Sequence, residues 1–279
     1  MAPMRVKDEV PVVLTVAGSD SGGGAGIQAD LKTFAAYGVH GTSAITVITA
    51  QNTLGVTAVQ EIDLSVIAAQ IDAVVEDMHP VAVKTGMLSS PEIVRLVAVK
   101  AKEHGWQTLV VDPVMVASSG AKLLRDEAVE TYRRELLPLA TVTTPNLHEA
   151  AELTGIEITS TDDARKAARA IHDMGVSYVI VKGGHMESSG SGGESLDILY
   201  DGDGFIEFGL PWIDTTSTHG TGCTFASALT SQLALGRDIE SAFRSAKKFV
   251  WEAMKAAYPV GQGQGPLNQM WRMPKNAED

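Results

Sequence analysis

Residues 216–225 combine side chains and glycines in the pattern of this sequence that points most directly to chemistry. Gly220 and Gly222 precede a run of small and apolar residues with helical spacing, so we predict that this loop opens a helix. Unpaired amides at a helix start, with the positive end of the helix dipole behind them, attract phosphate groups. With Thr221 between the glycines, the loop is a candidate anion hole.

Cys223 follows this loop and is the only cysteine of the chain. A thiol at a helix N-terminus has a lowered pKa, so we predict thiolate character and a group that could take a proton from a substrate hydroxyl. A small buried cysteine in a tightly packed helix start would give the same local pattern. A lone cysteine excludes an intramolecular disulfide and a multi-cysteine zinc site.

Several polar residues follow segments that are expected to be strands. Asp112 and Glu149 are carboxylates at such positions, where they could hold magnesium directly or through water. Asn146 and Glu149 also have the spacing of a helix capping box, which is a structural role. Lys182 could reach a nucleotide phosphate, although many such lysines are only solvated. His219 adjoins the anion loop and could act as a base, but loop histidines are often structural.

An alternation of strands and helices must position these residues. We expect strands at 12–16, 43–49, 81–84, 108–111, 141–143 and 178–181. We expect helices at 27–35, 64–75, 91–102, 126–134, 147–153, 162–174, 221–235 and 239–257. This rhythm predicts an α/β fold with a parallel sheet, in which ligands bind at the carboxyl ends of the strands. One crevice could therefore collect the polar residues that follow the strands.

The later part of the chain departs from this rhythm. Residues 183–193 are rich in glycine and serine, and two short apolar segments follow, separated by Asp-Gly-Asp-Gly, which predicts a hairpin. A chain of 279 residues can form one large core. The expected organisation is a single domain over 1–279, with an N-terminal extension (1–10), a flap or hairpin (183–208) and a C-terminal tail (259–279).

Composition and missing motifs exclude several classes of protein. The formal net charge of -12 argues against sequence-independent nucleic-acid binding. No segment near the N-terminus is long enough for a signal peptide or a membrane span, which predicts a cytoplasmic protein with no membrane role. Residues 24–29 match part of a dinucleotide fingerprint, but residues 49–52 lack the acid that a Rossmann site requires. The sequence contains neither a P-loop nor a Gly-x-Ser-x-Gly elbow.

The chain resembles the hydroxymethylpyrimidine/phosphomethylpyrimidine kinases of thiamine biosynthesis, members of the ribokinase-like superfamily. The resemblance runs from residue 13 to 266 and is carried by motifs at 17–20, 23–33, 50–53, 84–87, 112–115 and 144–147. It implies a three-layer αβα sandwich with a mainly parallel central sheet and a small peripheral hairpin. It also implies a kinase that uses ATP and Mg²⁺ to phosphorylate 4-amino-5-hydroxymethyl-2-methylpyrimidine and then its monophosphate.

The resemblance also implies roles for individual residues. Cys223 would be the base, and Gly220, Thr221 and Gly222 would supply the anion hole. Gln51 would bind the pyrimidine ring, because its amide offers a donor and an acceptor side by side. The other implied roles are pocket lining by Gly18, Asp20, Gly26, Val47 and Met87, nucleotide contacts by Asn146, Lys182, Thr218 and Lys247, and magnesium binding by Asp112 and Glu149.

Two alternatives stay open beside this interpretation. A pyridoxal or dual-specificity kinase would look similar over the whole length, although the Gln-Asn-Thr sequence at 51–53 favours the pyrimidine. A non-catalytic binding protein on the same fold is the second alternative, and an intact Cys223 with its glycines argues against it. The resemblance further suggests a homodimer that acts on a small molecule and carries no appended thiamine-biosynthesis domain.

Overall fold

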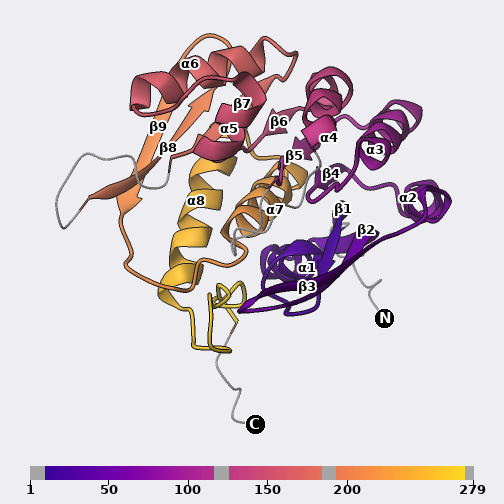
Figure 1. Cartoon of the computed structure of the whole chain (residues 1–279), viewed down its shortest axis with the longest axis horizontal. Helices are drawn as coiled ribbons and strands as arrows, with labels where there is room; N and C mark the ends of the chain where they lie inside the picture. Colours follow the sequence, from indigo (N-terminus) through magenta and orange to yellow (C-terminus); the bar gives the residue numbers. More distant parts are fainter. Residues whose placement is uncertain (1–9, 116–125, 184–192, 274–279) are drawn as a thin grey trace, which may run out of the picture.

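The computed structural model of the protein describes residues 10–115, 126–183 and 193–273. One nine-stranded sheet runs through it, in the order β3-β2-β1-β4-β5-β6-β7-β8-β9 (Figure 1). The strands are β1 (Val12–Asp20), β2 (His40–Asn52), β3 (Gly55–Glu61), β4 (Ala82–Thr85), β5 (Leu109–Val111), β6 (Val142–Thr143), β7 (Tyr178–Lys182), β8 (Glu194–Tyr200) and β9 (Phe205–Pro211). The helices are α1 (Gly26–Tyr37), α2 (Leu64–Met78), α3 (Pro91–Glu103), α4 (Asp126–Thr131), α5 (Leu147–Thr154), α6 (Thr161–His172), α7 (Thr221–Ala234) and α8 (Ile239–Lys255).

The centre of the sheet is parallel, as the sequence predicts. Strands β2, β1, β4, β5, β6 and β7 pair in parallel. Their sequences are runs of valine, isoleucine, alanine and threonine, and β1 is buried along nearly its whole length. Such runs suit strands that are covered on both faces. The carboxyl ends of these strands therefore meet at one edge of the sheet.

Helices cover both faces of the sheet and form a three-layer αβα sandwich, which confirms the predicted fold class (Figure 1). Helices α1, α7 and α8 lie on one face, where aromatic side chains such as Phe225, Phe243 and Phe249 form an apolar cluster. Helices α2 to α6 lie on the other face, over a larger cluster that includes Ile67 and Leu153. The two clusters hold the strands in a fixed plane.

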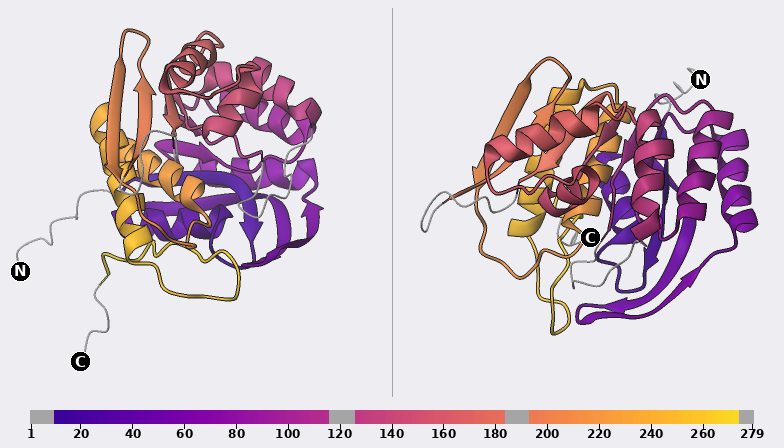
Figure 2. Two further views of the ribbon diagram at one scale, coloured as in Figure 1. Left: turned by 60° about the vertical axis from the view of Figure 1, so that its left-hand side comes forward. Right: turned by 45° about the horizontal axis from the view of Figure 1, so that its top comes forward.

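Antiparallel strands complete the sheet at both ends (Figure 2). At one end β3 pairs with β2 across a turn in which the Asn52 side chain accepts the amides of Leu54 and Gly55, at 2.9 and 3.3 Å. Strand β3 was not expected from the sequence, because its residues are mostly exposed and carry little apolar signal. At the other end the predicted hairpin forms as β8 and β9, but it extends the main sheet through β7.

Three other expectations need adjustment. Part of the expected flap, residues 184–192, lies outside the described residues, as do the first nine residues of the expected N-terminal extension. The helix expected over 126–134 ends as α4 at residue 131 and continues as a π-helical turn, Tyr132–Leu136, and a short 3₁₀ turn, Leu137–Leu139. The described part of the C-terminal tail, residues 259–273, is packed against the fold, because Leu267 is buried and the Gln269 amide donates to Thr224 Oγ1 at 3.1 Å.

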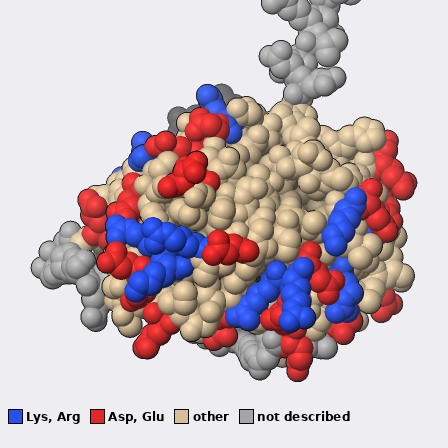
Figure 3. Space-filling model, turned by 90° about the horizontal axis from the view of Figure 1, so that it is seen from above, with Lys and Arg blue, Asp and Glu red and all other residues tan. Residues whose placement is uncertain are grey.

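Charged side chains of both signs lie side by side on the face shown in Figure 3. Exposed ion pairs lie along or across helices of the chain, such as Lys166 with Asp163 at 2.9 Å and Arg95 with Glu135 at 3.2 Å. Exposed pairs of this kind contribute at most about 1 kcal/mol each. The buried sheet and its two apolar clusters therefore hold the site in place.

Candidate active site

A cavity of about 480 Å³ opens at the carboxyl ends of β1, β4, β5 and β7, beside the first turns of α5 and α7. Elements far apart in the sequence reach this point together, because parallel strands end on the same side of the sheet. All but two of the site residues predicted from the sequence line this cavity. The predicted residues that line it are Gly18, Asp20, Gly26, Gln51, Met87, Asp112, Asn146, Glu149, Lys182, Thr218, Gly220, Thr221, Gly222 and Cys223.

The two exceptions are Val47 and Lys247, which are not among the residues that line the cavity. Val47 is fully buried in the core behind Gly18, where β2 pairs with β1. Lys247 lies on α8 with its ammonium group 2.9 Å from Asp197 Oδ2 on β8. This ion pair is nearly inaccessible to solvent, so Lys247 serves to join α8 to the hairpin.

The glycine loop opens α7 at Thr221, as predicted. Gly220 is the N-cap residue with φ +84°, and a Cβ there would lie 1.9 Å from the carbonyl oxygen of Gly24. Only glycine fits this close contact between the two glycine-rich loops. A Cβ at Gly222 would lie 3.1 Å from Lys182 Nζ. The start of α7 therefore lies directly beside the Lys182 ammonium group.

Cys223 lines the cavity together with Gly26, whose amide acts to lower the pKa of the thiol. Burial raises the pKa of this thiol to about 11, and the Lys84 ammonium group opposes the rise. The prediction of a lowered pKa is therefore wrong. Desolvation of the thiolate outweighs the favourable field at the helix start, so the thiol keeps its proton at neutral pH in the unliganded protein.

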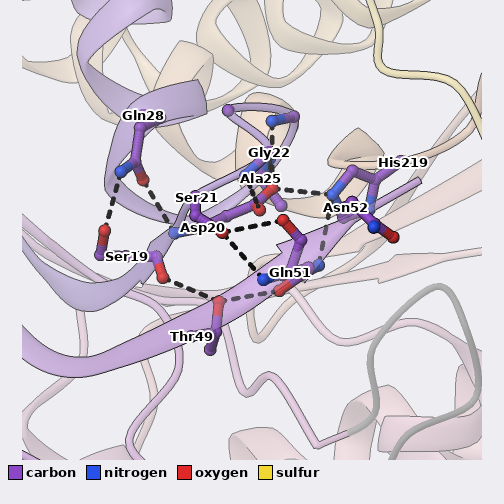
Figure 4. Close-up of polar contacts among 12 residues, drawn as sticks. Ser19, Asp20, Ser21, Gly22, Ala25, Gln28, Thr49, Gln51, Asn52 and His219 are labelled. Atoms are coloured by element: carbon purple, nitrogen blue, oxygen red, sulfur yellow. Dashed lines mark hydrogen bonds and ion pairs between the residues drawn. The ribbon is translucent and has the colours of Figure 1, made fainter. Parts of the chain in front are cut away.

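Asp20 organises the loop between β1 and α1 (Figure 4). Its carboxylate accepts the amides of Gly22, Gly24 and Ala25 at 2.8, 3.0 and 2.8 Å, and His219 Nε2 lies 2.8 Å from Oδ2. Burial pushes the pKa of Asp20 up, but the hydrogen bonds from His219 and the loop amides outweigh it and hold the pKa below its usual value. An ionised carboxylate therefore ties the first glycine loop to the loop that precedes α7.

Gln51 belongs to the same network (Figure 4), and it is one of the residues that line the cavity. Its amide lies 3.1 Å from Thr49 Oγ1 and 3.4 Å from His219 Nε2, and Thr49 in turn donates to the Ser19 carbonyl at 2.9 Å. The sequence placed Gln51 after a strand, whereas it lies within β2, which continues to Asn52. Its amide is therefore held between a hydroxyl and an imidazole and can present polar atoms to a ligand.

The far end of the cavity is charged. Lys182 Nζ lies 3.1 Å from Asp112 Oδ1, while Asp112 Oδ2 is buried without a hydrogen-bond partner among the described residues. Asn146 and Glu149 form the predicted capping box, with both reciprocal hydrogen bonds at 2.8 Å. Burial raises the pKa of Glu149 to about 7, which Lys182 opposes and Asp112 reinforces. This end holds two carboxyl groups and one lysine within reach of a polar ligand.

The sequence analysis missed a buried ion pair that also borders the cavity. Lys84 Nζ lies 3.0 and 2.9 Å from the two carboxylate oxygens of Asp30, and both side chains are inaccessible to solvent. Thr15 and Ser227 also donate to Asp30, at 2.7 and 2.6 Å. A lysine that ends an otherwise apolar strand was the signal that could have revealed this pair.

Comparison with known proteins identifies the family of the chain. The fold matches that of ribokinase-like kinases of small molecules. The family model described as phosphomethylpyrimidine kinase matches residues 20–268, and the chain belongs to this family. A hydroxymethylpyrimidine/phosphomethylpyrimidine kinase of Bacillus subtilis is 51% identical over 255 residues, which cover 91% of this chain and 93% of that protein.

Two solved structures are also similar. An ADP complex of Bacillus subtilis pyridoxal kinase has a TM-score of 0.88 and 40% identity, and the match covers 95% of this chain and 100% of that one. A phosphomethylpyrimidine kinase of Clostridium difficile has a TM-score of 0.77 and 45% identity, covering 88% of this chain and 99% of that one. The chain is therefore similar in fold to kinases named for two different substrates.

Proposed function

We propose that this protein is an ATP-dependent kinase that phosphorylates 4-amino-5-hydroxymethyl-2-methylpyrimidine and then its monophosphate, giving the diphosphate for thiamine biosynthesis. The observation that carries this proposal is that the same cavity is lined by Gln51 and by Asp112 and Lys182. Cys223 and the start of α7 line the same cavity. Family membership supplies the substrate class.

The charged end of the cavity suits the nucleotide. Lys182 and the first amides of α7 would bind phosphate oxygens, with Asn146 and Thr218 beside them. No group of three or more acidic, histidine or cysteine side chains among the described residues forms a complete metal site. Asp112, with its unpartnered oxygen, and Glu149 would hold Mg²⁺ together with phosphate oxygens, as is usual for this ion. When bound, Mg²⁺ would neutralise charge on the transferred phosphoryl group.

Positioning would provide most of the catalysis. The hydroxymethyl oxygen of a pyrimidine held by Gln51 would face Cys223 and the amides of Gly220, Thr221 and Gly222. Because phosphoryl transfer passes through a loose transition state, the main task is to align the hydroxyl with the phosphate and to stabilise spread-out negative charge. Cys223 would receive the hydroxyl proton, which requires a thiolate.

A pyridoxal kinase, or an enzyme with both specificities, is the second candidate. Its support is the high structural similarity to a pyridoxal kinase. The Gln51 amide favours the pyrimidine, because the edge of an aminopyrimidine presents a ring nitrogen acceptor beside an amino donor. A homodimeric state and a cytoplasmic location stay predictions from the sequence. Among the described residues no helix is long and apolar enough to cross a membrane.

Release of ADP with magnesium and ATP tests the proposal, with hydroxymethylpyrimidine, its monophosphate and pyridoxal compared at matched concentrations. Turnover of both pyrimidines well above that of pyridoxal is expected. A clear preference for pyridoxal would replace the main proposal with the second candidate. Absence of turnover with all three substrates would argue that the protein is not a vitamin kinase.

A further inference from the structure

Helices α1 and α7 meet in two layers beneath the cavity. In the upper layer Gly26 at the start of α1 and Cys223 on α7 line the same cavity, and the Gly26 amide favours the thiolate by lowering the pKa of the thiol. One turn further along both helices, Ser227 on α7 donates to Asp30 on α1 at 2.6 Å. Residues four positions apart lie on the same face of a helix, so the thiol stands directly above the Asp30 carboxylate layer.

Lys84 enters this arrangement from below. It lies in β4, one residue before the strand ends and beneath α7, and its ammonium group donates to both oxygens of Asp30. It lines the same cavity as the thiol. A Cβ at Gly86 would lie 2.9 Å from Lys84 Nζ, so the absence of a side chain at Gly86 keeps the space beside the ammonium group open.

Four charged groups surround the thiol from the elements packed around it. Lys84 on β4 and Lys182 on β7 are positive, while Asp30 on α1 and Asp112 after β5 are negative. Lys84 is the strongest of these influences on Cys223 and opposes the effect of burial. Lys182 is paired with Asp112 at 3.1 Å and faces the nucleotide end of the cavity. Both lysines are ion-paired, and Lys84 is the one whose carboxylate partner, Asp30, is also held by Ser227, one helical turn below the thiol.

We propose that Lys84 is a positioning residue for phosphoryl transfer, whose buried ammonium group stabilises the negative charge on the Cys223 sulfur when the thiol has given up its proton. This proposal rests on the proposed kinase function only for its catalytic consequence. The electrostatic effect on the thiol exists without any substrate. Asp30 holds the ammonium group in place and partly offsets its charge.

The proton balance of the step is simple. The Cys223 thiol first releases its proton to solvent, while Lys84 stays protonated. The substrate hydroxyl oxygen then forms a bond to the γ-phosphorus of ATP, and the bond from that phosphorus to its bridging oxygen breaks, leaving the electron pair on ADP. The hydroxyl proton passes to the Cys223 sulfur. Lys84 exchanges no proton and contributes only its charge.

Because Cys223 is the only cysteine, its alkylation by iodoacetamide reports on this thiol alone. Only the thiolate reacts, so the rate measured between about pH 7 and pH 9 follows the thiolate fraction. We expect Lys84→Met to slow alkylation about tenfold at each pH, which corresponds to one pKa unit. We expect Asp30→Asn to accelerate it. Lys100→Met is the matched control, because Lys100 pairs with Asp72 between α3 and α2, and its rate should stay within about twofold.

Lys84→Met leaves the Asp30 carboxylate buried without its partner, so this variant could fail to fold. The double variant Lys84→Met/Asp30→Asn removes both charges together, and it tests the proposal if the single variant does not fold. We expect its alkylation to be about threefold slower than that of the unchanged protein, because the effect of the lysine on the thiolate is larger than that of the carboxylate. Circular dichroism confirms that each measured variant is folded. Alkylation rates equal to those of the unchanged protein in the folded lysine variants would overturn the proposal.

Turnover gives the second readout. In the folded lysine variant, the rise of kcat with pH should move to higher pH by the same shift as the alkylation profile, while KM for the pyrimidine stays unchanged. A fall in kcat without a shift of the pH profile would show a merely structural role and would overturn the proposal. If the unchanged protein phosphorylates no vitamin substrate, the proposed function fails, but alkylation still decides the role of Lys84.

Discussion

Replacing Asp20 tests whether one carboxylate holds the two glycine loops of the cavity together. Asp20→Ala removes the acceptor of three backbone amides and of His219. The amide of Gly22 is exposed and can turn to water, whereas that of Gly24 is buried. In the alanine variant the buried Gly24 amide therefore lacks an acceptor, because water cannot reach it to replace the missing carboxylate oxygen.

The expected loss of stability follows from these contacts. A buried donor without a partner costs about 1–3 kcal/mol, and the amides of Gly24 and Ala25 with His219 are the groups affected. We expect Asp20→Ala to lower the free energy of unfolding by about 3–5 kcal/mol. Asp20→Asn keeps one acceptor oxygen but turns an NH₂ group towards other donors, so we expect a loss of about 1–3 kcal/mol.

Urea unfolding at neutral pH measures both losses, and Asp238→Asn is the matched control. Asp238 accepts the Ser241 amide at 2.9 Å at the exposed start of α8, where asparagine caps equally well, so its unfolding midpoint should not move. Because the folded protein lowers the pKa of Asp20, its ionised carboxylate stabilises the fold above its usual pKa of 3.8. This contribution is lost as the pH falls through the lower folded value.

A difference between Asp20→Asn and the unchanged protein that persisted unaltered at low pH would contradict this account. Equal stability of the alanine variant at neutral pH would refute it entirely. In that case water or another group must satisfy the Gly24 and Ala25 amides. The measurement thus separates a true anchoring carboxylate from one that only lies near the loop.

Three further predictions concern the cavity itself. Cys223→Ala should lower kcat at least about a hundredfold with little change in pyrimidine affinity, and near-normal turnover would exclude a base role. Gln51→Ala should weaken pyrimidine binding by about 1–3 kcal/mol in calorimetry, and an unchanged dissociation constant would assign ring recognition elsewhere. Because burial raises the pKa of Glu149 to about 7, the folded protein gains stability from its protonated form below its usual pKa of 4.5, and this gain is lost as the pH rises through 7. Glu149→Gln should therefore stabilise the unliganded protein by about 1–3 kcal/mol at pH 8 in urea unfolding, and this effect should be absent at about pH 4. If the variant and the unchanged protein were equally stable at both pH values, the raised pKa of Glu149 would be contradicted.

Much of the fold was predictable from local sequence signals. The change between short β-branched runs and helical spacing predicted the parallel centre of the sheet, and the capping box of Asn146 and Glu149 formed as expected. Strand β3 was missed because its residues are mostly exposed, and an exposed strand carries little apolar pattern. It forms by pairing with β2, from which a short turn separates it. The assignment of Val47 and Lys247 to the site came from the family resemblance. In the structure Val47 is buried in the core and Lys247 is paired with Asp197 of the hairpin.

The sequence by itself determined the features that depend on neighbours along the chain, namely the glycine loop that opens α7 at Thr221 and the placing of polar residues after strands. Tertiary structure decided the chemistry of Cys223. The field at a helix start is local and can be inferred from sequence, but desolvation is the sum of all groups packed around the thiol, and it raised the pKa to about 11. Only the folded chain also brings Lys84 to Asp30, 54 residues away, beneath that thiol.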